Sequence, residues 1–280
     1  MSVCSTRAAR RRPCLGAVVP CALLCLILPM AWTLPPAADE APELVKSDPK
    51  SGLELWRTAL GPMWIPAPGI HVIRHLLWES TVERVYHHPE VHVRPGDIVI
   101  DCGAHIGGFT RLALKAGASK VVAVEPEKAN LRAFRKNLEA ELKSSRVVLV
   151  EKGVWEASGK MSLHLSHTGD SHSFIVKPAG PGDQGVEMTT LDALAAGLAL
   201  GRVDFIKMDI EGSERNALKG ARAILERWKP RLAISSYHLQ GDPAEICTLV
   251  WKMRPDYLVT AKDVIRAPHG TTVPKVLFFR

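Results

Sequence analysis

From about residue 97 onward, short apolar runs alternate with segments of helical spacing, and this alternation limits the fold more than any other feature. The apolar runs have the length of buried strands and occur at 98–100, 121–124, 147–150, 203–208 and 232–235. Helices are predicted over 109–116, 127–142, 190–199, 213–226 and 243–252, with further strands near 257–260 and 275–279. Strands joined by helices form a parallel sheet covered on both faces, so we predict an α/β fold.

Three segments do not follow this alternation. Residues 153–190 contain glycines, histidines and short stretches of alternating hydrophobicity, which predicts a hairpin-like insertion or a loop-rich lid. Residues 51–96 contain three tryptophans and several prolines, and we interpret them as an N-terminal cap that packs on the sheet or closes over the site. Residues 33–50 are rich in Pro, Ala, Asp and Glu, which is typical of a linker. The domain with the alternating pattern is therefore 97–280.

Residues 1–32 resemble a targeting segment. Arg10, Arg11 and Arg12 are followed by an apolar run from Leu15 to Trp32, which is typical of a signal peptide or a membrane anchor. The run has 18 residues, close to the minimum that spans a bilayer, so we expect membrane anchoring through residues 15–32 or entry into the secretory pathway. Two alternatives stay open, because an Arg-rich start without acids also fits a mitochondrial transit peptide, and translation from Met30 would give a cytoplasmic protein.

The positive charge of the chain is concentrated in this N-terminal segment. The formal net charge is +7, but residues 1–38 hold four arginines and no acid, which leaves 32 basic and 29 acidic residues, or +3, for the rest. A basic stripe with interleaved aromatic residues is also missing, so we expect no nucleic-acid partner. Beyond this segment the sequence has only Cys102 and Cys247, too few for a disulfide framework, and no Cys/His spacing indicates zinc.

A glycine-containing turn after the first predicted strand is the strongest local signal for a ligand site. The segment from Asp101 to Gly108 follows the strand directly and opens a helix. In an open α/β sheet such turns lie at the carboxyl ends of strands, where ligands bind. The spacing of Gly103 and Gly107 differs from the GxGxxG dinucleotide pattern. The carboxylate of Asp101 would repel a pyrophosphate but would suit a ligand with an amino group.

The second predicted strand ends in Glu125 and Pro126. A carboxylate at this place can accept hydrogen bonds from both hydroxyls of a ribose. With the preceding turn, it predicts a pocket for a nucleoside with a cationic amino-acid tail, which describes S-adenosylmethionine. The alternative is a turn whose glycines serve packing alone. The predicted cofactor-binding residues are Asp101, Gly103, His105, Gly107, Glu125, Pro126, Glu151 and Asp209.

A second group of polar residues follows two later strands. Asp209 and Glu211 stand just after the strand at 203–208, and His238 follows the strand at 232–235. These three are the candidate catalytic residues, and His238 is the favoured general base because an unperturbed histidine titrates near neutrality. Each also has a plainer interpretation: cofactor orientation for Asp209, a contact with nearby cations for Glu211, and a solvent-facing position for His238. Two acids without a third ligand do not define a cation site, so no metal is predicted.

At these motifs the sequence resembles the FkbM-type S-adenosylmethionine-dependent methyltransferases. The matching segments are 95–97, 101–107, 124–126, 190–192 and 204–221, and the resemblance covers roughly residues 80–260. It implies a class I methyltransferase (Rossmann-like) fold, in which a seven-stranded, mostly parallel sheet has helices on both faces and an antiparallel last strand. It also implies methyl transfer to oxygen in many members. One departure is His105, which stands where the family commonly has Asn, and we expect the cofactor site to tolerate it.

These features favour an S-adenosylmethionine-dependent methyltransferase that O-methylates a small-molecule or glycan hydroxyl. Two alternatives stay open. The first is a non-catalytic protein that binds the cofactor on the same fold, an idea that the targeting segment supports because the methyl donor is made in the cytosol. The second is a nicotinamide-dependent oxidoreductase, which the loop spacing opposes. The segments expected to shape the acceptor pocket, 51–96 and 153–190, contain no motif that identifies the acceptor.

Overall fold

The computed structural model describes residues 41–166, 173–178 and 185–280. The predicted targeting segment at 1–32, with its apolar run at 15–32, lies outside these residues, as does the first part of the predicted linker. Among the helices that are described, none has the length and hydrophobicity to cross a bilayer.

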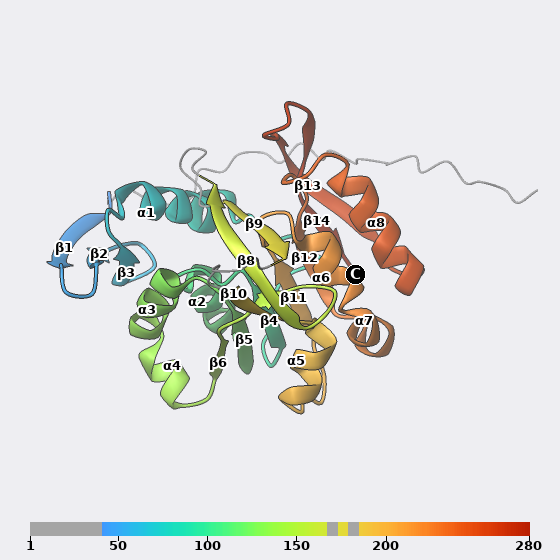
Figure 1. Ribbon diagram of the computed structural model, residues 1–280, viewed down its shortest axis with the longest axis horizontal. Helices are drawn as coiled ribbons and strands as arrows, with labels where there is room; N and C mark the ends of the chain where they lie inside the picture. The colour runs from blue at the N-terminus through green and yellow to red at the C-terminus, as the bar shows by residue number, and fades with distance from the viewer. Residues whose placement is uncertain (1–40, 167–172, 179–184) are drawn as a thin grey trace, which may run out of the picture. The chain divides into compact units, whose positions relative to one another are not determined.

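A seven-stranded sheet forms the centre of the domain (Figure 1). Its strands lie in the order β13 (Val259–Arg266), β14 (Thr272–Phe279), β12 (Arg231–Ser235), β11 (Phe205–Met208), β4 (Ile98–Cys102), β5 (Lys120–Val124) and β6 (Val147–Val150). The five strands from β12 to β6 are parallel, and β14 runs antiparallel to both β12 and β13. The predicted fold class is therefore confirmed, including the antiparallel last strand.

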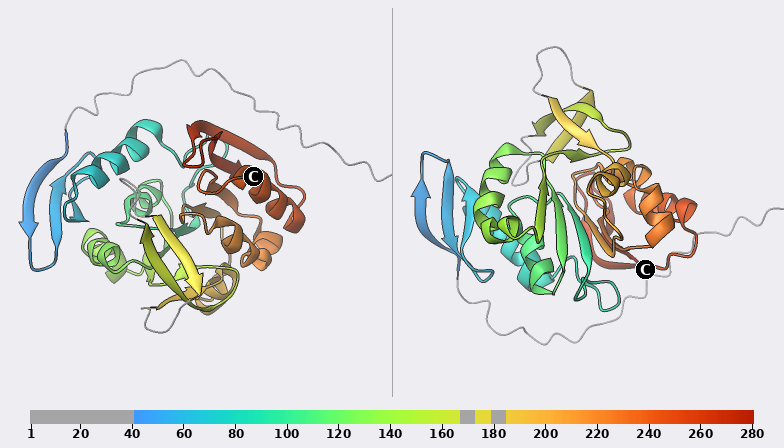
Figure 2. Two further views of the ribbon diagram at one scale, coloured as in Figure 1. Left: turned by 45° about the horizontal axis from the view of Figure 1, so that its top comes forward. Right: turned by 90° about the horizontal axis from the view of Figure 1, so that it is seen from below.

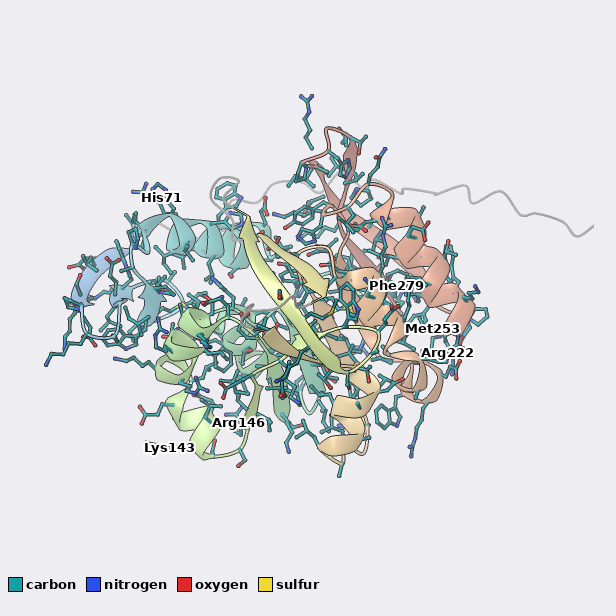
Figure 3. All side chains as sticks on the ribbon, viewed as in Figure 1. His71, Lys143, Arg146, Arg222, Met253 and Phe279 are labelled. Atoms are coloured by element: carbon teal, nitrogen blue, oxygen red, sulfur yellow. The ribbon has the colours of Figure 1, made fainter. Side chains whose placement is uncertain are left out.

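Helices cover both faces of this sheet because neighbouring residues on each strand point to opposite sides. Val99 and Phe205 pack on one face with Ala113 of α2 (Gly108–Lys115) and Phe134 of α3 (Lys128–Asn137). The other face packs against α5 (Leu191–Gly197), α6 (Glu214–Lys219), α7 (Arg222–Trp228) and α8 (Asp242–Met253). Figure 3 shows the contrast between the buried Phe279 and the exposed Lys143 and Arg222.

Two helices that the spacing predicts as continuous are interrupted. The predicted helix 127–142 is divided into α3 and α4 (Glu139–Lys143) at Leu138, which has φ −129° and is buried in the core. The predicted helix 213–226 is divided into α6 and α7 at Gly220. A Cβ on Gly220 would lie 2.5 Å from the carbonyl oxygen of Trp155, so the break brings two backbones into close approach.

The N-terminal region adds a small antiparallel sheet of β1 (Glu43–Asp48), β2 (Leu53–Arg57) and β3 (Met63–Pro66). It is followed by α1 (Ile70–Leu77) and η1 (Trp78–Glu83). The strand β1 corrects the linker interpretation over residues 43–48. Its side chains are almost all exposed, and it joins the sheet through its backbone, so no apolar alternation marks it in the sequence.

The inserted segment after β6 is a second small sheet. Its strands lie in the order β7 (Gly153–Val154), β10 (Gly185–Thr189), β8 (Gly159–Ser166) and β9 (Ser173–Pro178). Strands β8 and β9 pair as an antiparallel hairpin, as the alternating pattern predicts. Figure 2 shows this hairpin, in yellow, standing apart from the seven-stranded sheet.

The side chain of Asn137 fastens the N-terminal sheet to the main domain. Its Oδ1 accepts a hydrogen bond from the Trp64 amide at 2.6 Å, and its Nδ2 donates to the carbonyl oxygens of Trp64 and Ile106 at 2.9 and 2.8 Å. Arg111 adds hydrogen bonds to the carbonyl oxygens of Leu60 and Pro62, both at 3.0 Å. These long-range hydrogen bonds to backbone groups add to the apolar packing of the cap, in which Met63 and Ile65 share a buried cluster with Ile106 and Ala133.

We expect Asn137→Ala to loosen this attachment. The partly buried Trp64 amide and the two carbonyl oxygens lose their partner, which lowers the free energy of unfolding by about 1–3 kcal/mol. Chemical denaturation and limited proteolysis of residues 53–66 measure the effect. Asn216→Ala is the control, because among the residues that the structure describes its side chain bonds only the exposed Lys219 ammonium. Equal stability of the two variants would contradict the fastening role of Asn137.

Candidate active site

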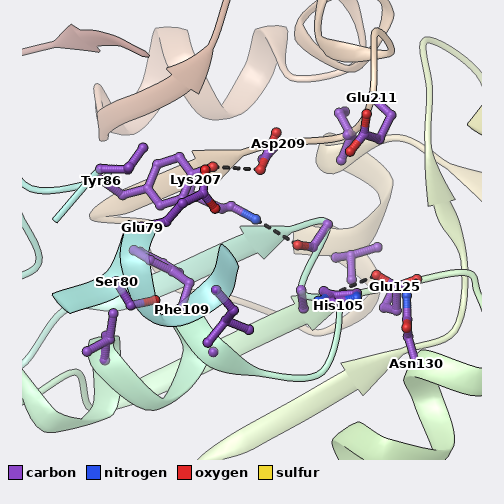
Figure 4. A pocket seen from close by; sticks show the side chains of 18 of the residues that line it. Glu79, Ser80, Tyr86, His105, Phe109, Glu125, Asn130, Lys207, Asp209 and Glu211 are labelled. Atoms are coloured by element: carbon purple, nitrogen blue, oxygen red, sulfur yellow. Dashed lines mark hydrogen bonds between the residues drawn. The ribbon is translucent and has the colours of Figure 1, made fainter. Parts of the chain in front are cut away.

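A cavity of about 510 Å³ lies at the carboxyl ends of β4, β5, β11 and β12 (Figure 4). Its volume is within the ~300–1,000 Å³ that is usual for small-molecule sites. Residues of the loops after these four strands line it, and so do α1, η1 and the following segment of the N-terminal region. The lining residues used below are Tyr86, Gly103, His105, Glu125, Pro126, Lys207, Asp209, Glu211 and His238.

The glycine turn after β4 folds back onto β5. The amides of Gly103 and Ala104 both donate to the carbonyl oxygen of Val124 at 3.0 Å. Gly103 has φ +76°, and a Cβ there would lie 1.9 Å from the carbonyl oxygen of Asp209, so only glycine fits. Gly107 has φ +93° and does not line the cavity, since its α-carbon faces Leu138 and Phe134. The packing alternative therefore describes Gly107, whereas Gly103 borders the cavity.

Glu125 is held in the cavity wall by backbone groups. Its Oε2 accepts from the His105 amide at 2.8 Å, and its Oε1 accepts from the Glu127 amide at 2.9 Å and from Asn130 Nδ2 at 3.4 Å. Burial raises the pKa of Glu125, although the two amides act in the opposite direction. A carboxylate has about four acceptor positions, so three partners leave room for a ligand hydroxyl. Pro126 lines the cavity next to it.

Asp101 is not among the residues that line the cavity, and its predicted contact with the cofactor stays a prediction. Its carboxylate is fully buried, accepts from Thr110 Oγ1 at 2.7 Å and lies 3.2 Å from Lys207 Nζ. Lys207 in turn donates to the carbonyl oxygens of Cys102 and Gly103 at 3.1 and 2.7 Å. Asp101 therefore supports the glycine turn through Lys207.

Glu151 is not among the lining residues of the cavity, although the adjacent Lys152 is, and its cofactor-binding role stays a prediction. Its side chain is 54% exposed and forms an ion pair with Arg135 of α3. Glu151 directly follows β6, the edge strand farthest from β12 in the parallel part of the sheet. Glu151 therefore lies at the end of a strand, as the sequence predicts, but its side chain pairs with Arg135 on a surface helix.

Asp209 is connected to the N-terminal cap. Tyr86 donates from its hydroxyl to Asp209 Oδ2 at 2.6 Å (Figure 4). Burial and the negative charge of Asp209 raise the pKa of Tyr86 well above its ordinary value, so the phenol stays protonated as a donor. Burial acts against ionisation of Asp209, yet Lys207 and His238 hold the pKa of this carboxyl below its ordinary value.

His238 lies among three carboxylates. Its Nε2 is 3.5 Å from both Asp209 Oδ1 and Glu211 Oε2, and its Nδ1 is 3.1 Å from Glu214 Oε1. Burial alone would lower the pKa of His238, but these carboxylates, Glu214 first, raise it to about 10. The imidazole is therefore protonated at neutral pH in the ligand-free protein. This corrects the premise that His238 titrates near neutrality and is ready to act as a base.

Glu211 completes this cluster from the turn after β11. It has φ +55°, a left-handed backbone conformation that non-glycine residues seldom adopt. Burial, together with the charge of Asp209, raises the pKa of Glu211 to about 7. The structure thus brings together all three residues predicted to be catalytic, with one ligand-type atom of each within 4.8 Å of the others.

Three important residues were not predicted as part of the site. Lys207 had a detectable signal, since a charged residue inside the apolar strand Phe205–Met208 needs a buried partner. Glu214 is fully buried and accepts hydrogen bonds from the amides of Ile210 and Gly212. Tyr86 had no local signal, because its partner Asp209 is 123 residues away.

Comparison with known proteins agrees with this architecture. The family model for the methyltransferase FkbM domain matches residues 101–256. A solved structure of methyltransferase FkbM from Methylobacillus flagellatus is similar in fold, with a TM-score of 0.50 and 23% identity. The match covers 76% of this chain and 60% of that one, so this chain spans about 60% of that protein's length.

Other matches are weaker. A candidate methyltransferase from Streptococcus mutans in complex with SAH has a TM-score of 0.40 and 16% identity, over 68% of this chain and 90% of that one. No curated protein sequence matches the chain.

Proposed function

Because the chain belongs to the FkbM methyltransferase family, we propose that it transfers the methyl group of S-adenosylmethionine to a hydroxyl oxygen of a small molecule or a glycan. One observation carries this proposal: a single cavity contains both Glu125 and the cluster of Asp209, Glu211 and His238. Glu125 is suited to accept hydrogen bonds from a ribose, and the cluster is suited to a hydroxyl group that must lose a proton.

The order of the strands supports a division of this cavity into two regions. Glu125 follows β5 and His238 follows β12, and the strands β4 and β11 lie between them. Three strand spacings of ~4.8 Å separate the two regions by roughly 14 Å. A nucleoside at Glu125 therefore needs an extended tail to reach Asp209, and the acceptor occupies the space near Tyr86 and His238.

When bound, S-adenosylmethionine supplies a methyl group on a positively charged sulfur. The acceptor oxygen forms a bond to the methyl carbon, the carbon–sulfur bond breaks with its electron pair on sulfur, and the hydroxyl proton passes to the protein. Glu211 is the candidate proton acceptor because its side chain is 27% exposed, compared with 22% for Asp209 and 8% for His238. Asp209 already accepts the Tyr86 hydrogen bond. Alignment of the reacting groups supplies much of the rate enhancement.

Turnover with labelled donor tests the proposal. The full chain is incubated with S-adenosylmethionine labelled in its methyl group and with fractionated pools of small molecules and glycans. We expect label in a base-stable methyl ether, together with the demethylated donor. Label in a base-labile ester or on nitrogen would contradict a hydroxyl acceptor. Donor binding without turnover in any pool would favour the non-catalytic alternative.

Glu125→Gln should weaken binding of S-adenosylmethionine by roughly 10- to 100-fold. The substitution removes the charge from a hydrogen-bond acceptor, and hydrogen bonds to charged groups contribute about 1.5–3 kcal/mol. Calorimetric titration measures the affinity. Glu151→Gln is the matched control, because that exposed side chain lies outside the cavity, and its affinity should equal that of the unmodified chain. Equal weakening in both variants would remove Glu125 from the site.

A further inference from the structure

The cluster of Asp209, Glu211 and His238 has a geometry that its hydrogen bonding does not explain. His238 Nε2 lies 3.5 Å from a carboxylate oxygen of each acid. That separation is longer than an ordinary N–H···O hydrogen bond of about 2.7–3.2 Å. Two ligand atoms that each lie ~2.1 Å from one metal ion, at 90–120° to one another, are roughly 3.0–3.6 Å apart. The spacing therefore fits atoms that share an ion.

Two buried atoms in the cluster point to the same explanation. His238 is 8% exposed, and its Nε2 and Asp209 Oδ1 form an ion pair across 3.5 Å but make no hydrogen bond among the described residues. His238 Nδ1 also makes no hydrogen bond of good geometry, although it lies 3.1 Å from Glu214 Oε1. A buried polar atom without a partner costs about 1–3 kcal/mol. Two such atoms facing one another at the wall of a cavity are satisfied together if one cation binds between them.

Residues around the cluster orient its ligand atoms. Glu214 is fully buried and lies 3.1 Å from His238 Nδ1, where it favours a proton on that nitrogen, so a bound ion displaces the proton from Nε2. Tyr86 occupies Asp209 Oδ2 and leaves Oδ1 free. Histidine ligands in metal sites commonly have such a carboxylate behind them, which sets the tautomer and the ring orientation.

The combination of donor atoms selects the type of ion. Mg²⁺ and Ca²⁺ prefer sites made of oxygen alone, whereas imidazole with carboxylates suits first-row transition ions. Three protein ligands leave coordination positions open, and Asp209, Glu211 and His238 all line the cavity. We propose that these three residues bind a divalent first-row transition ion, which coordinates the acceptor hydroxyl at an open position.

This inference rests on the proposed function and adds a role to the cluster. A hydroxyl bound to a divalent ion loses its proton more readily than a free one. With one oxygen of Glu211 on the ion, its other oxygen remains to receive that proton before it passes to water.

Metal titration of the full chain tests the site independently of turnover. The chain is treated with a chelator, dialysed and titrated with Mn²⁺ alone, and bound ion is followed by electron paramagnetic resonance. Mn²⁺ is the appropriate probe because the cysteines at 4, 14, 21 and 25 would attract softer ions such as Zn²⁺. We expect one equivalent to bind, and we expect Asp209→Asn and His238→Gln each to weaken binding at least tenfold.

Two further variants keep the outcome decisive. Glu211→Gln alters the most exposed ligand and should also weaken binding if the more buried variants fail to fold. His269→Gln, in the turn between β13 and β14, is the control and should leave binding unchanged. Absence of Mn²⁺ binding, or binding that survives all three cluster substitutions, would overturn the site. If methyl transfer from S-adenosylmethionine persists in the presence of the chelator, the proposed function stands without the ion. If Mn²⁺ binds but S-adenosylmethionine does not, the proposed function fails and the metal site stands.

Discussion

Lys207→Met should lower the free energy of unfolding by about 3–5 kcal/mol. Lys207 is 4% exposed and Asp101 is fully buried, so the substitution leaves the Asp101 carboxylate as a buried charge without its counterion. It also removes the donor for the carbonyl oxygens of Cys102 and Gly103, which shape the turn beside the cavity. Chemical denaturation monitored by circular dichroism measures the loss.

Two variants separate charge pairing from general disruption. Lys219→Met removes a lysine whose ion pair with Glu156 is nearly half exposed, and it should change stability by less than about 1 kcal/mol. The double variant Lys207→Met with Asp101→Asn removes both charges and should recover part of the loss. If Lys207→Met has the same stability as Lys219→Met, the buried pair does not support the glycine turn.

Gly103→Ala should lower the free energy of unfolding nearly as much as Lys207→Met, but for a steric reason. The residue has φ +76°, a conformation that costs an alanine about 1–2 kcal/mol. The added methyl group would also lie 1.9 Å from the Asp209 carbonyl oxygen, and the forced displacement adds about 1–3 kcal/mol. Because the turn and Asp209 border the same cavity, we also expect S-adenosylmethionine affinity to fall more than tenfold. Thermal unfolding and calorimetry give the two quantities.

Gly96→Ala is the matched control for the close approach. Gly96 has φ +86°, but a Cβ there meets no atom within 4 Å. The control therefore measures the conformational penalty alone, and the difference between the two variants isolates the contact with Asp209. If both variants lose the same free energy of unfolding, the turn after β4 moves away from Asp209 without an energetic cost.

The fold could be predicted from the sequence because its signals are local. Runs such as Ile98–Ile100 and Val121–Val124 show where buried strands lie, and the intervening helical spacing implies parallel order. The same logic placed Glu125, Asp209 and His238 at strand ends, and all three line the cavity. The prediction of secondary structure failed where a strand pairs through its backbone alone, as in β1. It also failed where a close backbone contact interrupts a helix, as at Gly220.

What a side chain does at a strand end depended on partners far away in the chain. Asp101 and Glu151 occupy the expected positions at strand ends, where their carboxylates pair with Lys207 and Arg135. Strand order decides such pairings, because β11 lies next to β4 although about 100 residues separate them. The same order sets His238 beside Asp209 and Glu211, and the carboxylates around it change its protonation state. Residue type and spacing therefore determined which groups stand at the strand ends, and tertiary contacts decided which of them line the cavity, with what charge and with which partners.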